Sequence, residues 1–206
     1  MGIKIGNPDL NVVVMGGDGD GLAIGAAHFP HACRRNIDVT YIMMDNFIYG
    51  LTKGQASPTT HQTKITKTTP EGPPEIPLDP SVFAITFGAT FVARCFSAQP
   101  TILSDILVQA IQHKGFSFVQ VLSPCTTFYD TYQMCRENTD ALPEGYHDIH
   151  NQNEALQVAI QRDPVRLGIL YRAENHPVRV QGKPLAERLG HRERMQEIDK
   201  MFARYA

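Results

Sequence analysis

The feature that most constrains the fold of this chain is an apolar run that ends in a cluster of glycines and aspartates. Residues 12–15 are Val-Val-Val-Met, and residues 16–21 are Gly-Gly-Asp-Gly-Asp-Gly. A continuous apolar run of this kind is typical of a strand buried in a parallel sheet, and glycines allow the tight turn after it. A helix is predicted over 22–35, where Pro30 predicts a kink or a second helical start, and a second strand over 39–44. This order predicts a parallel strand–helix–strand unit.

The rest of the chain predicts more elements of the same class. Short apolar runs predict three further strands, over 90–95, 116–122 and 165–171. Apolar residues at helical spacing, or a capping residue, predict three further helices, over 81–87, after Pro100 and after Asn151. We therefore predict an α/β fold, with an open, mainly parallel sheet and helices on both of its faces.

The domain organisation follows from two stretches of different composition. Residues 52–80 contain six prolines and many threonines. So long a stretch without regular structure is typical of a functional loop or a linker. The tail from Lys183 is polar, and a peripheral helix is predicted over 192–204. We predict one domain over 1–175, which includes the long loop, and a C-terminal tail over 176–206.

Charge and hydropathy exclude two classes of partner. The 206 residues include 19 basic and 21 acidic side chains, for a formal net charge of −2. This balance predicts no binding to nucleic acid or to an anionic membrane. No apolar run approaches the roughly 20 residues that span a bilayer, and the N-terminal residues lack the apolar stretch of a secretion signal. We expect a soluble, cytoplasmic protein.

Cysteines and histidines are the residues to test first as metal ligands. The four cysteines form no CxxC pair, and they are Cys33, Cys95, Cys125 and Cys135. Their spacing predicts neither a zinc knuckle nor a redox pair, and free thiols suit a reducing compartment. His28 and His31 lie three residues apart on a predicted helix, but no other residues complete a metal set. We interpret these histidines as polar residues of a helix face.

Polar residues at two strand ends predict a ligand site. Gly17-Asp18-Gly19 follows the first strand and Asp45-Asn46 follows the second. Ligands of open parallel sheets bind beyond the carboxyl ends of the strands, where glycines let backbone N–H groups approach a phosphate. Mg²⁺ is held by a few protein oxygens together with phosphate oxygens and water. The pattern therefore favours a magnesium diphosphate site, although Gly-Asp-Gly alone is also an ordinary turn with an N-cap aspartate.

The residues around these positions are similar to a known family. Twenty-five residues separate Gly19 from Asp45-Asn46. A Gly-Asp-Gly motif followed at this spacing by an asparagine resembles a thiamine diphosphate motif. Four strings resemble the β subunit of 2-oxoacid:ferredoxin oxidoreductases: Gly-Asp-Gly-Asp-Gly-Leu-Ala-Ile-Gly (17–25), His-Ala-Cys-Arg-Arg-Asn-Ile-Asp (31–38), Tyr-Gly-Leu-Thr-Lys-Gly-Gln (49–55) and Ser-Pro-Thr (57–59). The resemblance covers about residues 2–175.

The resemblance implies a role for each of these positions. Asp18, the Asn46 side chain and the Ile48 carbonyl would bind Mg²⁺. The diphosphate would lie along four residues of the glycine loop, Gly17, Gly19, Asp20 and Gly21. Asp45 stands where asparagine is frequent in the family, at a position that need not touch the metal. The substrate would face three residues of the next loop, Leu51, Thr52 and Lys53. A lysine there suits a carboxylate or a coenzyme A phosphate, and Leu-Thr-Lys resembles enzymes that use 2-oxoglutarate or broader 2-oxoacids.

The resemblance also implies parts that this chain does not supply. Cys125, in a Ser-Pro-Cys string, resembles one ligand of a [4Fe–4S] cluster, and such a cluster normally needs four thiolates. The other three would lie upstream, so Cys125 is either an orphaned ligand or a plain buried cysteine. We expect an N-terminally truncated subunit with apolar sheet surface left uncovered. No catalytic residue is assigned in the chain, because the acid that activates the cofactor is expected from the α subunit.

These features together predict part of an oxidoreductase. The intact heteromer would oxidatively decarboxylate a 2-oxoacid to an acyl-coenzyme A and pass the electrons to ferredoxin. Two alternatives stay open: a non-oxidative thiamine diphosphate decarboxylase or synthase, and a non-catalytic fragment that docks onto a partner subunit. The Leu-Thr-Lys-Gly-Gln string and Ser-Pro-Cys favour the first interpretation over the non-oxidative one.

Overall fold

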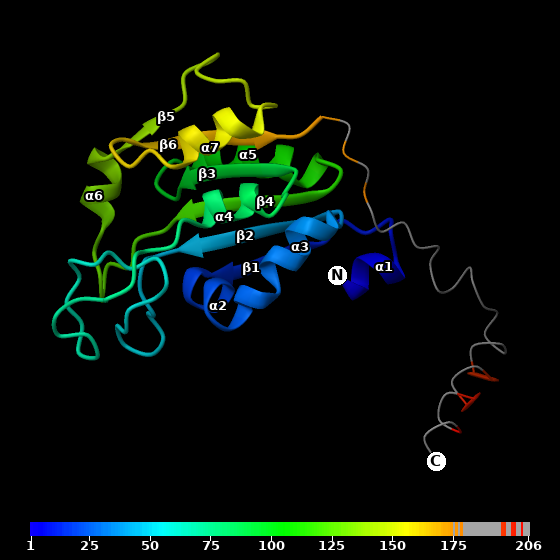
Figure 1. Ribbon diagram of the computed structural model, residues 1–206, viewed down its shortest axis with the longest axis horizontal. Coiled ribbons are helices and arrows are strands. Elements are labelled where there is room, and N and C mark those ends of the chain that lie inside the picture. The colour runs from blue at the N-terminus through cyan, green and yellow to red at the C-terminus, as the bar shows by residue number, and fades with distance from the viewer. Residues whose placement is uncertain (175, 177, 179–194, 197–198, 201–202, 204–206) are drawn as a thin grey trace.

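The computed structural model describes residues 1–174, 176, 178, 195–196, 199–200 and 203 (Figure 1). Its strands are β1 (Val13–Gly17), β2 (Val39–Asp45), β3 (Phe91–Phe96), β4 (Phe116–Leu122), β5 (Thr139–Ala141) and β6 (Val165–Arg172). Its helices are α1 (Gly2–Gly6), α2 (Asp18–Leu22), the 3₁₀ helix η1 (Ile24–Ala27), α3 (Phe29–Arg35), α4 (Pro80–Thr86), α5 (Pro100–Gln112), α6 (Tyr132–Glu137) and α7 (Gln152–Ala159). The peripheral helix predicted over 192–204 falls mainly outside the described residues.

The six strands form one sheet in the order β1-β2-β4-β3-β6-β5. β1, β2, β4 and β3 pair in parallel, whereas β6 pairs with β3 in the antiparallel direction. The arrowheads of β2, β3 and β4 accordingly point to the same end of the sheet in Figure 1, and β6 runs the other way. The predicted open, mainly parallel sheet is confirmed, and α1, α6 and β5 are elements that were not predicted.

Helices cover both faces of the sheet, as predicted. One core cluster joins α2, α3, α4 and α7 to the sheet, and it includes Phe29, Phe118 and Leu170. The second cluster lies under α5, whose Ile106 and Ala110 pack on the opposite face. β3 and β4 are buried along their whole length, because helices cover them on both sides. Burial of such strands removes apolar surface from water and gives the main stabilising term of the fold.

Two predictions about the first strand–helix unit are wrong in detail. The helix predicted over 22–35 is three shorter pieces, α2, η1 and α3. The second helical start predicted at Pro30 is confirmed, because Pro30 lies in the first turn of α3. The backbone at Gly25 lies so close to Asp20 that a Cβ on Gly25 would be 2.6 Å from the Asp20 carbonyl oxygen. Glycine therefore allows the chain to turn here. The first strand was predicted to be buried, but β1 is an edge strand with a single neighbour, and the Met15 side chain is 67% exposed.

The long segment between β2 and α4 contains no helix or strand, in agreement with its proline and threonine content. It lies at the end of the sheet where the β2 arrowhead points (Figure 1). The Tyr49 hydroxyl fixes it there by donating to the Gly19 carbonyl of α2 at 2.9 Å, and within the segment the Leu78 N–H donates to the Pro58 carbonyl at 2.8 Å. None of the helices that the structure describes is long and apolar enough to cross a bilayer.

Candidate cofactor site

The ends of β1 and β2 bring two of the predicted metal ligands together. Gly17 and Met44 are register partners in the parallel pair β1–β2, so the residues just beyond them are neighbours. Asp18 begins α2 and is only 2% exposed. The backbone N–H of Asn46 donates to the Oδ1 of Asp18 at 3.4 Å. A buried carboxylate next to a neutral amide is a donor set that fits Mg²⁺.

The loop from Asn46 to Ile48 is a tight turn. The Asn46 Oδ1 accepts a hydrogen bond from the Ile48 N–H at 3.0 Å, which holds the amide over its own backbone. Phe47 between them has a φ of 61°, in the left-handed region, and Ile48 is 2% exposed. The turn thus presents an amide oxygen and a backbone carbonyl from one short segment. No group of three or more histidine, cysteine, aspartate or glutamate side chains gathers as a metal site among the described residues, so a metal here would need these amide and carbonyl oxygens.

The glycines of the first loop have two different surroundings. A Cβ on Gly19 would lie 2.3 Å from the Tyr49 ring, and one on Gly21 would lie 2.2 Å from the Tyr41 hydroxyl. These two glycines are needed for packing against tyrosines. A Cβ on Gly17 would meet nothing closer than 3.9 Å, so the backbone there is open to an approaching group. The Asp20 carboxylate turns back towards Gly17 and accepts from its N–H at 3.4 Å.

A second buried carboxylate lies directly behind Asp18. Asp45 is 0% exposed, and burial, reinforced by the charge of Asp18, raises the pKa of its carboxyl to about 7. The Thr59 hydroxyl lies between the two acids, 2.8 Å from Asp18 Oδ2 and 2.9 Å from Asp45 Oδ1. From the sequence, Asp45 was expected at a position that need not touch the metal. Thr59 had no assigned role, although it belongs to the Ser-Pro-Thr string that resembles the family.

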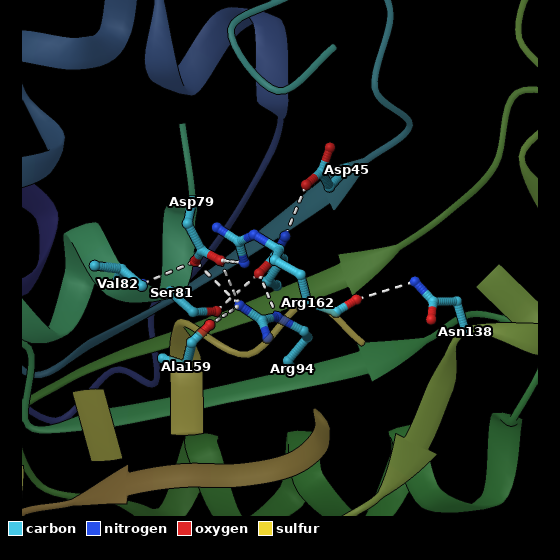
Figure 2. Close-up of polar contacts among 9 residues, drawn as sticks. Asp45, Asp79, Ser81, Val82, Arg94, Asn138, Ala159 and Arg162 are labelled. Atoms are coloured by element: carbon cyan, nitrogen blue, oxygen red, sulfur yellow. Dashed lines mark hydrogen bonds and ion pairs between the residues drawn. The ribbon is translucent and has the colours of Figure 1, made fainter. Parts of the chain in front are cut away.

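A chain of polar contacts continues from Asp45 into the sheet (Figure 2). Gln120 donates to Asp45 Oδ2 at 2.8 Å through its Nε2, and its Oε1 accepts from Arg94 Nε at 2.9 Å. Arg94 is 1% exposed and donates through Nη2 to both carboxylate oxygens of Asp79. Arg162 contacts the same carboxylate from the surface side. The sequence signal for this network is one large polar residue in each of two mainly apolar strands.

A cavity of about 420 Å³ adjoins this network. Asp45, Thr59, Gln120 and Arg94 form part of its wall, and loop residues such as Ile76 line it as well. Most of its lining surface is apolar, with polar groups concentrated at the network. Asp45 and Thr59 thus separate this cavity from Asp18 and the glycine loop.

The predicted substrate residues lie on an exposed loop next to the glycine loop. Tyr49 and Gln55 form an antiparallel bridge that closes the loop, and the Tyr49 hydroxyl donates to the Gly19 carbonyl at 2.9 Å. Leu51 is 99% exposed, and Lys53 is also exposed, with a φ of 72°. Thr52 is exposed as well, and its hydroxyl contacts the Gln55 side chain. The structure therefore tethers this loop to the glycine loop and leaves its tip free to meet a ligand.

Cys125 differs from the other cysteines in its surroundings. Cys33, Cys95 and Cys135 are buried, whereas Cys125 is half-buried, and all four are free thiols. A Cβ on Gly50 would lie 3.9 Å from both Cys125 Sγ and Asn46 Nδ2, so the thiol flanks the candidate site. His28 and His31 are both exposed.

The chain is similar to known proteins along most of its length. Residues 1–121 match the family described as thiamine pyrophosphate enzyme, C-terminal TPP binding domain, and residues 125–185 match the C-terminal region of the pyruvate ferredoxin oxidoreductase beta subunit. The 2-oxoglutarate synthase subunit KorB of Archaeoglobus fulgidus is 50% identical over 126 residues, which are 61% of this chain and 47% of that protein. The 2-oxoacid:ferredoxin oxidoreductase subunit beta of a Sulfolobus species is 40% identical over 189 residues, covering 85% of this chain and 62% of that one.

A solved structure agrees with these sequence relatives. The 2-oxoglutarate:ferredoxin oxidoreductase from Magnetococcus marinus, with 2-oxoglutarate, coenzyme A and succinyl-CoA bound, matches with a TM-score of 0.84 and 38% identity. The match covers 96% of this chain and 70% of that chain. Against the curated relatives, the present chain spans about half of their length.

Proposed function

This chain belongs to the family of thiamine-pyrophosphate-binding β subunits of 2-oxoacid:ferredoxin oxidoreductases, and we propose that it holds the diphosphate and Mg²⁺ of thiamine diphosphate for such an enzyme. The observation that carries the proposal is the meeting of Asp18 and Asn46 at adjacent strand ends, next to the open backbone of Gly17. A diphosphate and a divalent cation are the ligands that such a strand-end site suits.

The residues divide the binding between them. Asp18 would give the metal a negatively charged oxygen, and Asn46 and the Ile48 carbonyl would give neutral ones. The backbone of Gly17 to Gly21, with its N–H groups at the start of α2, would lie along the diphosphate. Thiamine diphosphate, when bound, supplies the carbon chemistry of 2-oxoacid decarboxylation, while the protein binds and orients it.

Substrate recognition is proposed for the loop that follows. Lys53 is a cation on an exposed loop tethered to the glycine loop through Tyr49, so it can meet the second carboxylate of a substrate such as 2-oxoglutarate or a coenzyme A phosphate. Leu51 and Thr52 would flank it. The relatives named for 2-oxoglutarate, and the structure with 2-oxoglutarate and coenzyme A bound, support this choice of substrates.

The intact enzyme would be a heteromer in the cytoplasm. It would release CO₂ from the 2-oxoacid, form an acyl-coenzyme A and pass two electrons to ferredoxin. An α subunit would supply the acid that activates the cofactor. Cys125, a half-buried thiol that flanks the candidate site, would be one ligand of a [4Fe–4S] cluster completed by cysteines outside this chain.

Calorimetric titration of the chain with thiamine diphosphate, with and without Mg²⁺, tests the proposal. We expect saturable binding that requires Mg²⁺, and a loss of more than about 100-fold in affinity for Asp18→Ala, because a metal ligand is removed. Asp105→Ala is the matched control, since Asp105 is exposed on α5 at the opposite face of the sheet. Equal affinity of Asp18→Ala and the unchanged chain would show that the diphosphate site has been placed wrongly.

A further inference from the structure

One hydroxyl group separates the two buried carboxylates of the candidate site. Thr59 Oγ1 is 2.8 Å from Asp18 Oδ2 and 2.9 Å from Asp45 Oδ1, and all three residues are at most 3% exposed. Two buried carboxylates at such close quarters disfavour each other unless polar hydrogens lie between them. The Thr59 hydroxyl has one hydrogen, which can be donated to only one of the two acids at a time, and an oxygen of each acid lies within its reach. Thr59 therefore decides how the two acids are arranged.

The segment that carries Thr59 is fixed to the chain beyond β2. Thr60 donates its hydroxyl hydrogen to the Phe47 carbonyl at 2.6 Å, and it accepts from the Ser57 N–H at 2.7 Å. The Ser57 hydroxyl is also 3.3 Å from that of Thr59. These contacts tie residues 57–60 to the turn that contains Asn46. The Thr59 hydroxyl is therefore carried by a segment that the Ser57 and Thr60 hydrogen bonds hold next to this turn.

Asp45 is held on its other side by the sheet. Gln120 donates to Asp45 Oδ2 at 2.8 Å, while its Oε1 accepts from Arg94 at 2.9 Å and from Ser81 at 2.8 Å. Two donors on Oε1 leave only one amide orientation that satisfies all three contacts. Arg94 and Gln120 are register partners on β3 and β4, so the central strands determine where the Asp45 carboxylate lies.

We propose that Thr59 is a positioning residue that fixes Asp18 for metal binding. Its hydroxyl occupies one oxygen of Asp18 and thereby sets the rotamer in which the remaining lone pairs face the Asn46 side. The same hydroxyl, with Gln120 and the Phe47 N–H, occupies the oxygens of Asp45 and turns that acid away from the metal. The inference rests on the proposed function and adds to it a residue that touches neither cofactor nor metal.

Magnesium titrations of matched variants test the inference. Thr59→Val removes the hydroxyl at nearly the same volume, Thr59→Ser keeps it, and Thr66→Val is the control. Thr66 is also buried and hydrogen-bonded, but only within its own turn at 66–69. We expect Thr59→Val to weaken Mg²⁺ affinity in the presence of thiamine diphosphate by about 10- to 100-fold, as for other groups that orient metal ligands. Thr59→Ser and Thr66→Val should bind Mg²⁺ as the unchanged chain does. Thr59→Ala takes the place of Thr59→Val if that variant does not fold.

Amide hydrogen exchange of the cofactor-free chain separates this inference from the proposed function. The Phe47 N–H donates to Asp45 and the Ile48 N–H to Asn46, so both report on the arrangement of the turn. They should exchange faster in Thr59→Val and at unchanged rates in Thr59→Ser. Failure of the unchanged chain to bind would overturn the proposed function, while the exchange rates would still decide the role of Thr59. Unchanged exchange and unchanged Mg²⁺ affinity in Thr59→Val would overturn the inference itself.

Discussion

Replacing Asp79 with asparagine separates the charge of a buried ion pair from a helix-capping hydrogen bond. Asp79 accepts from the Val82 N–H at 2.9 Å at the start of α4, and asparagine caps a helix as well as aspartate does. Its carboxylate is also 2.8 Å from Arg94 Nη2, with side-chain exposures of 8% and 1%. Asp79→Asn therefore keeps the cap and leaves the Arg94 guanidinium buried without its counter-charge.

The cost of this change should be about 3 kcal/mol, at the low end of the ~3–5 kcal/mol typical for breaking a buried pair. The low end is chosen because the second cation, Arg162, is 57% exposed and returns to water without penalty. Within the described part of the chain, Arg94 Nη1 already lacks a hydrogen-bond partner, so the guanidinium depends on its remaining contacts for stabilisation of its charge. The asparagine Oδ1 still accepts one hydrogen bond from it.

Urea unfolding followed by circular dichroism measures the effect. With a slope of about 2 kcal/mol per molar, a loss of 3 kcal/mol moves the midpoint down by about 1.5 M. Asn151→Ala is the control, because it removes the cap of α7 without touching an ion pair and should cost about 1 kcal/mol. The double variant Asp79→Asn/Arg94→Met should lose less than the sum of the two single changes. A shift no larger than that of Asn151→Ala would refute the assignment of a stabilising buried charge pair.

The Asp79–Arg94 ion pair also predicts how the free energy of unfolding depends on pH in acid. Burial alone would raise the pKa of Asp79, but the charges of Arg94 and Arg162 and the Val82 N–H hold it below its ordinary value. The unfolded chain then takes up the proton first as the pH falls. The contribution of the pair is therefore complete above the unfolded pKa of about 3.9 and is lost as the pH falls through the folded value. Asp79→Asn should flatten the curve in this range.

Two further measurements examine the core and its titratable groups. In the native chain iodoacetamide should label Cys125, while the buried thiols of Cys33, Cys95 and Cys135 should react only after unfolding. Burial raises the pKa of all three, to about 12 for Cys95 and about 11 for Cys135. Native labelling of Cys33 in peptide mass spectra would contradict the packing of α3. Burial, together with the Arg172 and His176 charges and against that of Asp38, lowers the pKa of His113 to about 4. As the pH falls from ~6.5 to 4, the unfolded chain therefore binds a proton before the folded chain does, and the free energy of unfolding should decrease. The decrease should be less steep in His113→Gln. Equal slopes of this free energy against pH in the two chains would exclude His113 as the cause.

Most of the local structure could be predicted, because it is determined by short-range patterns. The apolar runs gave β2, β3, β4 and β6 to within about one or two residues, and the Asn151 side chain caps α7 as expected, accepting from the N–H groups of Asn153 and Glu154. The second helical start at Pro30 was predicted, but the early end of α2 and the 3₁₀ turn η1 were not; Gly25 lies close to the Asp20 carbonyl at this point. The strand order and the reversed direction of β6 depend on pairings between distant segments, which periodicity does not record.

The candidate site divides in the same way. The meeting of Asp18 and Asn46 could be predicted, because parallel strands place their ends side by side and a local motif marks both ends. The network behind them was missed because Arg94 and Gln120 each stand alone in an apolar run, and each by itself is typical of an interrupted strand. Their register pairing makes them direct neighbours, and a buried polar group needs a partner. A guanidinium buried beside an amide requires an acid, which Asp79 supplies, and the free end of the amide then reaches Asp45. Once the order of the central strands is known, the isolated polar residues of β3 and β4 therefore lead from the core of the sheet to Asp45, which the Thr59 hydroxyl joins to the proposed metal ligand Asp18.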